Sequence, residues 1–211
     1  MAIAYRSVAR YDVITFDCYG TLIDWESGIR TAFESVGVDG ATALRAYAEI
    51  EPQVERQSYR SYRDVLTETG SRIAPQVRLA ESLPSWKPFL DTNPALHRLR
   101  ASGIRLGILS NVDDDLIAET RKHFTVEFDV IVTAQQVRSY KPAHAHFLEA
   151  RKRIGNAAWL HAAQSNLHDI VPANELAIPN AWINRHGQPA LPGGKPTYEF
   201  STLTQLAEAM T

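Results

Sequence analysis

The sequence predicts an α/β fold: a parallel, Rossmann-like sheet with a helical segment inserted after its first strand. Two patterns carry this prediction. From residue 93 onward, short apolar stretches rich in β-branched residues alternate with stretches of helical spacing. Between residues 26 and 83 the spacing is helical throughout, with no convincing strand. Strands that alternate with helices favour parallel βαβ units, whose helices cover both faces of the sheet.

The first strand is expected at residues 12–16, where the letters DVITF are mostly apolar or β-branched. Helices follow in the stretches GIRTAFESV, ATALRAYAEIEPQVERQSYRSYRDVLTET and PQVRLAESL, and Pro52 is expected to kink or start one of them. A further helix is expected at 93–103, with Asn93 as its cap, Pro94 in its first position and Gly103 at its end.

The alternating half of the chain supplies four more strands and four more helices. The strands are expected at 104–111, 128–134, 157–163 and 180–185. The helices are expected at 114–124, capped by Asp113, and at 142–154, 169–177 and 202–210. We therefore predict a core domain of residues 1–25 and 90–211, and a helical domain of residues 26–89 between two polar hinges rich in Pro and Gly.

Composition and charge exclude several classes of function. The formal net charge of −2 comes without a long run of one sign, so neither a nucleic-acid surface nor a basic membrane face is indicated. The single cysteine, Cys18, cannot form a disulfide within the chain, which fits a reducing, cytoplasmic setting. Residues 1–12 have no signal-peptide pattern, and no apolar stretch approaches the ~20 residues of a membrane-spanning helix.

Polar side chains follow the predicted strands at the edge where an open α/β sheet binds its ligand. These strand ends bring together an acid, hydroxyls, amides, a lysine and a second acid: Asp17, Thr21, Ser110, Asn111, Lys141, Asn166 and Asp169. The sequence therefore predicts a small-molecule site with a carboxylate nucleophile at this edge.

Four of these segments resemble, in order, the four motifs of the haloacid dehalogenase superfamily. They are FDCYGTLID around Asp17, LSN ending at Asn111, YKP around Lys141 and SNLHD ending at Asp169. The resemblance covers nearly the whole chain, and it implies that the helical segment is the cap domain that this superfamily places after its first motif.

The residue at position 19 favours one branch of that superfamily. Its phosphatases carry a second aspartate two places after the nucleophile, as general acid and base, whereas this chain has Tyr19. The stretch DCYGTL resembles the L-2-haloacid dehalogenase branch, in which a halide leaves without needing a proton. The resemblance implies that Asp17 forms an ester with a short 2-haloacid and that water then releases a 2-hydroxyacid.

The remaining roles follow from the same resemblance. Lys141 is expected to keep the pKa of Asp17 low, and Thr21 and Ser110 to hydrogen-bond the nucleophile or the substrate. Asp169 is expected to hold Lys141 and to activate water. The substrate-binding set is Tyr19, Asn111, Asn166 and the cap arginine, for which Arg45 is the first candidate and Arg56 the second. No metal or other cofactor is expected, and relatives often form homodimers, which leaves a homodimer as an open expectation.

Alternative interpretations stay open for single residues and for the whole chain. Asp17 and Asp169 are also the residue type that ends strands and caps helices, and Thr21 and Lys141 could be loop residues without a chemical role. A phosphatase that holds Mg²⁺ with Asp17, the Tyr19 carbonyl and Asp169 is the second enzyme hypothesis. A degenerate relative that only binds is the third.

Overall fold

Six parallel strands form the sheet at the centre of the computed structural model, which describes residues 10–56 and 59–211. Their order across the sheet is β3-β2-β1-β4-β5-β6. The strands are β1 (Val13–Phe16), β2 (Arg105–Ser110), β3 (Val130–Thr133), β4 (Trp159–Ala163), β5 (Asn180–Ile183) and β6 (Tyr198–Phe200). The α/β fold with a parallel sheet is thus confirmed.

The first strand along the chain lies in the interior of the sheet. Val13 of β1 is paired with Arg105 of β2 on one side and with Trp159 of β4 on the other. Every residue of β1 is buried, as expected of a strand covered on both faces. The residue after β1 therefore lies near the middle of the edge formed by the carboxyl ends of the strands, where a ligand site is expected.

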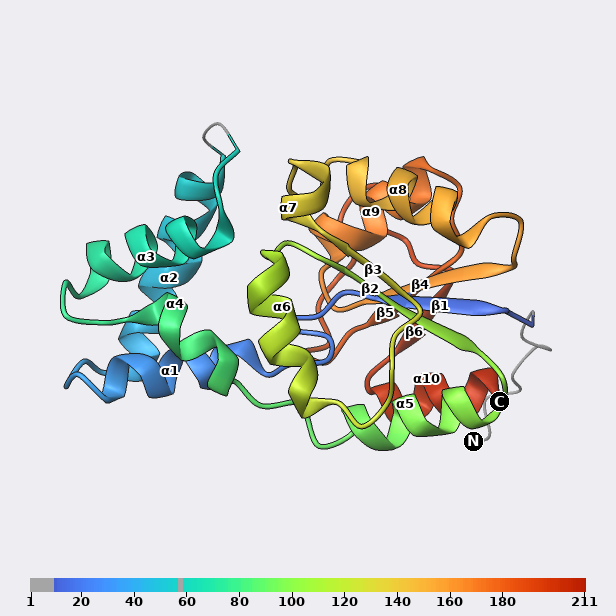
Figure 1. The fold of residues 1–211 in the computed structure, drawn as a ribbon, viewed down its shortest axis with the longest axis horizontal. Helices are drawn as coiled ribbons and strands as arrows, with labels where there is room; N and C mark the ends of the chain where they lie inside the picture. Colours follow the sequence, from blue (N-terminus) through green and yellow to red (C-terminus); the bar gives the residue numbers. More distant parts are fainter. Residues whose placement is uncertain (1–9, 57–58) are drawn as a thin grey trace.

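Helices cover both faces of the sheet (Figure 1). Helices α5 (Thr92–Ala101) and α10 (Leu203–Met210) pack on one face, and their leucines join Ile14, Phe16 and Ile108 in the larger hydrophobic core. Helices α8 (Ala145–Ile154) and α9 (Val171–Glu175) cover the other face. Each face of the sheet has its own hydrophobic core, because successive side chains of a strand point to opposite faces. Ile108 belongs to the larger core and Leu109 to the smaller one.

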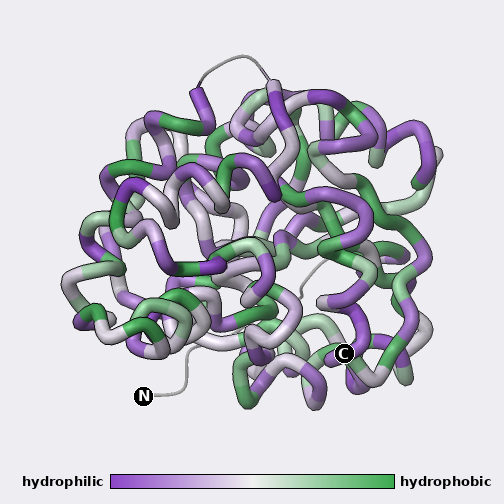
Figure 2. The backbone as a smooth tube through the Cα atoms, turned by 60° about the vertical axis from the view of Figure 1, so that its left-hand side comes forward, coloured by the Kyte–Doolittle hydropathy of each residue, from purple (hydrophilic) through white to green (hydrophobic). Residues whose placement is uncertain are grey.

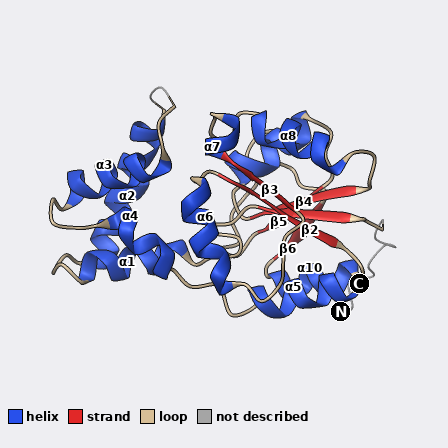
Figure 3. Ribbon diagram, viewed as in Figure 1, coloured by secondary structure: helices blue, strands red, loops and turns tan. Residues whose placement is uncertain are grey.

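The segment between β1 and α5 is helical and stands beside the sheet, beyond the carboxyl end of β1 (Figures 1 and 3). It contains α1 (Trp25–Glu34), α2 (Gly40–Glu55), α3 (Tyr62–Ile73) and α4 (Leu79–Ser82), and its described residues form no named strand. We call α1 to α4 the cap helices. The core has two more short α-helices, α6 (Asp114–Thr120) and α7 (Ala134–Val137). Short 3-10 or π-helical segments lie at Leu83–Ser85, Arg121–His123 and Asn166–Ile170. The division into domains at residues 25 and 90 stays a prediction.

Several local predictions are wrong in detail. The helix expected at 93–103 runs from Thr92 to Ala101, so Asn93 lies inside its first turn and does not cap it. The Asn93 side chain accepts from Thr125 N and donates to His123 O. Helix α2 does not start at Pro52 but passes through it. The edge strand β6 was not predicted. Asp113 stands at the N-cap position of α6, as predicted, but its side chain makes no capping hydrogen bond there.

Hydrophobic and hydrophilic stretches alternate along the tube of Figure 2. Within residues 10–56 and 59–211, no helix combines the length and the apolar character needed to cross a membrane. Residues 1–9, to which most of the predicted absence of a signal peptide refers, lie outside the described residues.

Candidate active site

Asp17 is the residue directly after β1, and the turn that follows it fixes one of its two carboxylate oxygens. Thr21 Oγ1 donates to Asp17 Oδ2 at 2.9 Å and accepts from the backbone N of Gln164 at 2.9 Å, which ties this turn to the end of β4. Gly20 has a φ of +99°, and a Cβ there would approach Gln164 Oε1 to 3.1 Å, so the tight turn requires glycine.

Lys141 lies between the two predicted acids and uses all three of its N–H donors. Its Nζ donates to Asp17 Oδ1 at 2.9 Å, to Asp169 Oδ1 at 2.6 Å and to the carbonyl of Leu109 at 2.9 Å. Asn111 holds the main chain of Lys141 from both sides, accepting from its N at 2.7 Å and donating to its O at 3.1 Å. The ammonium group is therefore fixed and fully hydrogen-bonded.

Asp169 has one oxygen bound and one free. Oδ1 accepts from Lys141 and from His161 Nε2, which lies 3.0 Å away, while Oδ2 is buried without a hydrogen-bond partner among the described residues. His161 Nδ1 is 2.9 Å from Thr15 Oγ1, which accepts from Trp159 Nε1. A buried chain of hydrogen bonds thus holds Asp169 from behind, and sequence reasoning did not assign His161 to the site.

Charge determines the ionisation of this cluster. Burial opposes ionisation of Asp169, but Lys141 and His161 outweigh burial and lower the pKa of Asp169 to about 2. Burial alone would lower the pKa of Lys141, yet the two carboxylates raise it above its ordinary value. Burial raises the pKa of Asp17, and Lys141 acts against that rise. Lys141 and Asp169 therefore stay charged at neutral pH.

A cavity of about 280 Å³ opens in front of these groups. Ser110 adds a hydroxyl that is buried, lines the cavity and has no hydrogen-bond partner among the described residues. The core side of the lining includes Asp17, Ser110, Asn111, Lys141 and Asp169, and the opposite side comprises Trp25, Tyr47, Ala48, Glu51, Glu55, Tyr62 and Trp86. The volume fits a small molecule.

Residues 11–163 match the model of a family described as haloacid dehalogenase-like hydrolases. This chain belongs to that family. A related (S)-2-haloacid dehalogenase from Pseudomonas putida is 26% identical over 92% of this chain and 94% of its own length. The dehalogenase-like hydrolase predicted from the sequence is thereby confirmed.

Solved structures of the same family share the fold of this hydrolase. The L-2-haloacid dehalogenase RSc1362 superposes with a TM-score of 0.85 at 22% identity, covering 96% of this chain and 99% of its own. The L-2-haloacid dehalogenase from Xanthobacter autotrophicus with chloropropionic acid covalently bound gives a TM-score of 0.81 at 16% identity, covering 94% and 97% of the two chains.

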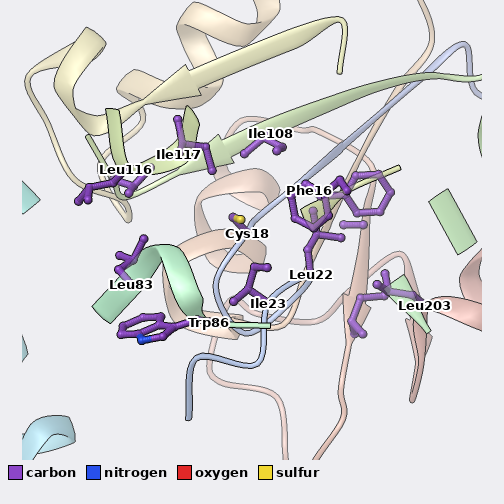
Figure 4. Close-up of a cluster of buried hydrophobic side chains, with 14 of the residues drawn as sticks. Phe16, Cys18, Leu22, Ile23, Leu83, Trp86, Ile108, Leu116, Ile117 and Leu203 are labelled. Carbon is purple, nitrogen blue, oxygen red and sulfur yellow. The ribbon is translucent and has the colours of Figure 1, made fainter. Parts of the chain in front are cut away.

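Tyr19 lines the cavity and is fixed at both ends. Its hydroxyl shares a hydrogen bond of 2.8 Å with Thr120, and its ring meets Trp86 edge to face, 6.0 Å between centroids. Burial raises the pKa of Tyr19 well above its ordinary value, so its phenol stays neutral. Its neighbour Cys18 lies within the hydrophobic core beside Phe16 and Ile23, as Figure 4 shows, and does not line the cavity.

Three predicted binding residues do not lie where the prediction needs them. Arg45 is exposed, donates to Thr42 Oγ1 and does not line the cavity, whereas Tyr47, two residues further along α2, does. Arg56 is exposed as well. Asn166 is buried but donates to Gly194 O and accepts from Leu191 N, so it holds a loop outside the cavity.

The wall formed by the cap helices carries acids that sequence reasoning missed. Tyr47, Glu51 and Glu55 follow each other at intervals of four on α2, so they form one stripe that faces the cavity. Burial raises the pKa of Glu51 to about 7 and that of Glu55 to about 8. The spacing of four in the sequence is enough to predict that these three residues share one face of a helix. It is not enough to predict that this face lines the cavity.

The magnesium alternative depends on which oxygens of Asp17 and Asp169 are free. Asp169 Oδ2 is free for a ligand, but the Oδ1 atoms of Asp17 and Asp169 are bridged by the ammonium group of Lys141. The described residues contain no cluster of three His, Cys, Asp or Glu side chains suited to a metal ion. A cation of the protein thus lies between the two Oδ1 atoms, and Asp169 Oδ2 is the carboxylate oxygen left for another partner.

Proposed function

We propose that this hydrolase cleaves a carbon–halogen bond in a short aliphatic compound through an ester on Asp17. The observation that carries the proposal is the pairing of Asp17 with Lys141 and Thr21 at the cavity, together with a tyrosine at position 19. The Tyr19 hydroxyl is bound to Thr120, and its pKa is raised. A halide leaves without a proton, so the reaction needs no acid at this position.

The reaction has two steps. A carboxylate oxygen of Asp17 forms a bond to the carbon, and the halide departs with the electron pair of the broken carbon–halogen bond. Water then attacks the carboxyl carbon of Asp17, and the alcohol leaves. The sum is RX + H₂O → ROH + H⁺ + X⁻. The free Oδ2 of Asp169 is the oxygen that we assign to the attacking water, as acceptor of its proton.

Lys141 and His161 form no bond to the substrate in these steps and act on the ionisation of the two aspartates. Lys141 opposes the protonation of Asp17 that burial favours, and together with His161 it keeps Asp169 ionised. The reaction as written requires no metal ion, and we propose that none is used.

Short 2-haloacids are the first compounds to test. The relative from Pseudomonas putida is named (S)-2-haloacid dehalogenase, and the structure from Xanthobacter autotrophicus holds covalently bound chloropropionic acid. With such a compound the product would be a 2-hydroxyacid.

Halide release tests the reaction independently of the charge of the substrate. The panel contains L-2-chloropropionate, its neutral amide, and (2-chloroethyl)trimethylammonium, each with and without EDTA. We expect at least one compound to release chloride, no effect of EDTA, and no release by Asp17→Asn. Chloride release from none of the three, with Mg²⁺-dependent hydrolysis of a phosphate ester, would favour the phosphatase alternative.

A further inference from the structure

We propose that the cavity selects a small organic cation, whose ammonium group lies against Glu51 and Glu55, over the carboxylate that the relatives' names imply. This inference rests on the proposed function, since it names the class of substrate for the same Asp17 chemistry. Glu51 and Glu55 would then be the residues that determine specificity.

The charges around the cavity disfavour an anion. Four carboxyl groups line it, from Asp17, Asp169, Glu51 and Glu55. Among the described lining residues Lys141 is the single lysine or arginine, and its three N–H groups are already donated to protein acceptors. A substrate carboxylate would therefore enter without a free lysine or arginine as its partner, and beside the ionised carboxylate of Asp169.

Aromatic side chains complete a lining suited to a cation. Trp25, Tyr47, Tyr62 and Trp86 line the side formed by the cap helices and the segment that follows them. Trp25 and Tyr47 lie 5.6 Å apart between ring centroids, and the hydroxyls of Tyr47 and Tyr62 share a hydrogen bond of 3.1 Å. Ammonium groups bind to the faces of tryptophan and tyrosine rings, and more strongly where water is excluded.

Glu55 is connected to the core side of the cavity. Asn111, which grips the main chain of Lys141, also donates to Glu55 Oε1 at 3.3 Å, so the acid from α2 is connected to the nucleophile's partner. Burial disfavours the ionised form of both glutamates in the empty cavity, and a bound ammonium group would favour it.

The core side of the cavity has hydrogen-bonding atoms that are not used by the protein. Ser110 Oγ and Asp169 Oδ2 are buried, line the cavity and have no partner within the described parts of the chain. In the proposed complex these two atoms hydrogen-bond the reacting end of the substrate and the attacking water. The acids and aromatic rings of the opposite wall contact the ammonium group. The ammonium group is unchanged in the reaction: Asp17 gains the bond to carbon, and halide leaves as before.

Equilibrium binding of unreactive ligands tests the charge preference without depending on turnover. Calorimetry on the full chain at pH 9 would compare choline, its neutral carbon isostere 3,3-dimethylbutan-1-ol, and L-lactate. We expect choline to bind at least about tenfold tighter than the isostere, and lactate to bind most weakly. Glu51→Gln with Glu55→Gln should remove most of the advantage of choline and leave the isostere within about twofold.

Glu49→Gln is the matched control, because Glu49 lies on α2 but is exposed and does not line the cavity. It should bind choline as the wild type does. Choline binding no tighter than the isostere, lactate binding tighter than choline, or no measurable binding of choline would each overturn the proposal, as would an unchanged preference in the double variant.

The two proposals can fail separately. Tight lactate binding with chloride release from L-2-chloropropionate would overturn the charge preference and leave the Asp17 reaction standing. Selective choline binding without chloride release from any compound would leave the cation site standing and overturn the proposed reaction.

Discussion

At the scale of single residues, the preorganisation of two carboxylates distinguishes this site. Asp17 receives one hydrogen bond on each oxygen, from Lys141 and from Thr21, whereas Asp169 keeps one oxygen without a partner among the described residues. These environments give the two acids different tasks. In the proposed reaction the first is the nucleophile, and the second is the ionised acceptor for a proton.

His161 should matter for the second chemical step. Its loss in His161→Leu removes one of the two hydrogen bonds to Asp169 Oδ1, and with it part of what fixes the orientation of the free Oδ2. If Asp169 activates water, kcat should fall at least about tenfold, since a hydrogen bond to a charged group is worth roughly 1.5–3 kcal/mol, and the ester on Asp17 should accumulate. Rapid-quench mass spectrometry would detect the ester.

Thr15→Val provides a milder version of the same perturbation. It removes the hydroxyl behind His161 but leaves the contact between His161 and Asp169, so its effect on kcat should be smaller. Equal kcat values in the wild type and in a folded His161→Leu variant would contradict the role given to this chain of hydrogen bonds.

At the scale of the elements, Asp113 connects the core to the cap helices. Its carboxylate accepts from the backbone N of Tyr62 at 3.0 Å and of Arg63 at 2.8 Å, so a residue that leads into α6 binds the N-terminus of α3. Tyr62 lines the cavity. The contact therefore fixes one aromatic wall relative to the strand ends.

Asp113→Ala should cost about 1–2 kcal/mol of unfolding free energy, as the loss of a helix cap does, and should also raise KM by freeing Tyr62. Denaturant unfolding and steady-state kinetics would measure the two effects. Asp39→Ala is the matched control, because Asp39 caps α2 from an exposed position and its loss should leave KM unchanged. Identical KM values in the two variants would refute the link between this contact and the cavity.

The main elements could be predicted because each has a strong local pattern in the sequence. Features that depend on contacts between distant parts of the chain could not be predicted. The strand around residues 12–16 and the acid after it were clear from the apolar run alone. The three-residue strand β6 was too short for any pattern, and the side chain of Asn93 bonds a loop 30 residues away. Arg45 was placed by family resemblance, and the helical rotation of α2 turns it outward.

At the scale of the whole molecule, the cavity contains two glutamates whose burial opposes their ionisation and so costs folding stability. Glu51 and Glu55 are partly buried beside each other, and their neighbours with charge or titratable groups are Lys141, Tyr47, Tyr62 and Tyr140. Burial raises the pKa of all three tyrosines, so they stay neutral near pH 8. The two glutamates are the groups of this set that titrate between pH 5 and 9.

The double variant Glu51→Gln with Glu55→Gln should therefore be more stable than the wild type at alkaline pH. Both pKa values are raised in the folded state, to about 7 and about 8, so the folded protein binds more protons and loses stability as the pH rises above the ordinary value of 4.5.

The stability gap should be small at pH 5 and reach at least about 1 kcal/mol at pH 9, discounted for partial exposure. Urea unfolding at both pH values would measure it. A gap that is independent of pH would show that the two glutamates are not titrating in this range.

The most direct test of the central claim is a single turnover in H₂¹⁸O with enzyme in excess. The substrate is the compound of the halide-release panel that is dehalogenated fastest. The account predicts that ¹⁸O enters the carboxylate of Asp17, detected by mass spectrometry of the peptide that contains it, while the first product carries unlabelled oxygen. Label found in the first product and absent from Asp17 would contradict the aspartyl ester and indicate direct attack by water.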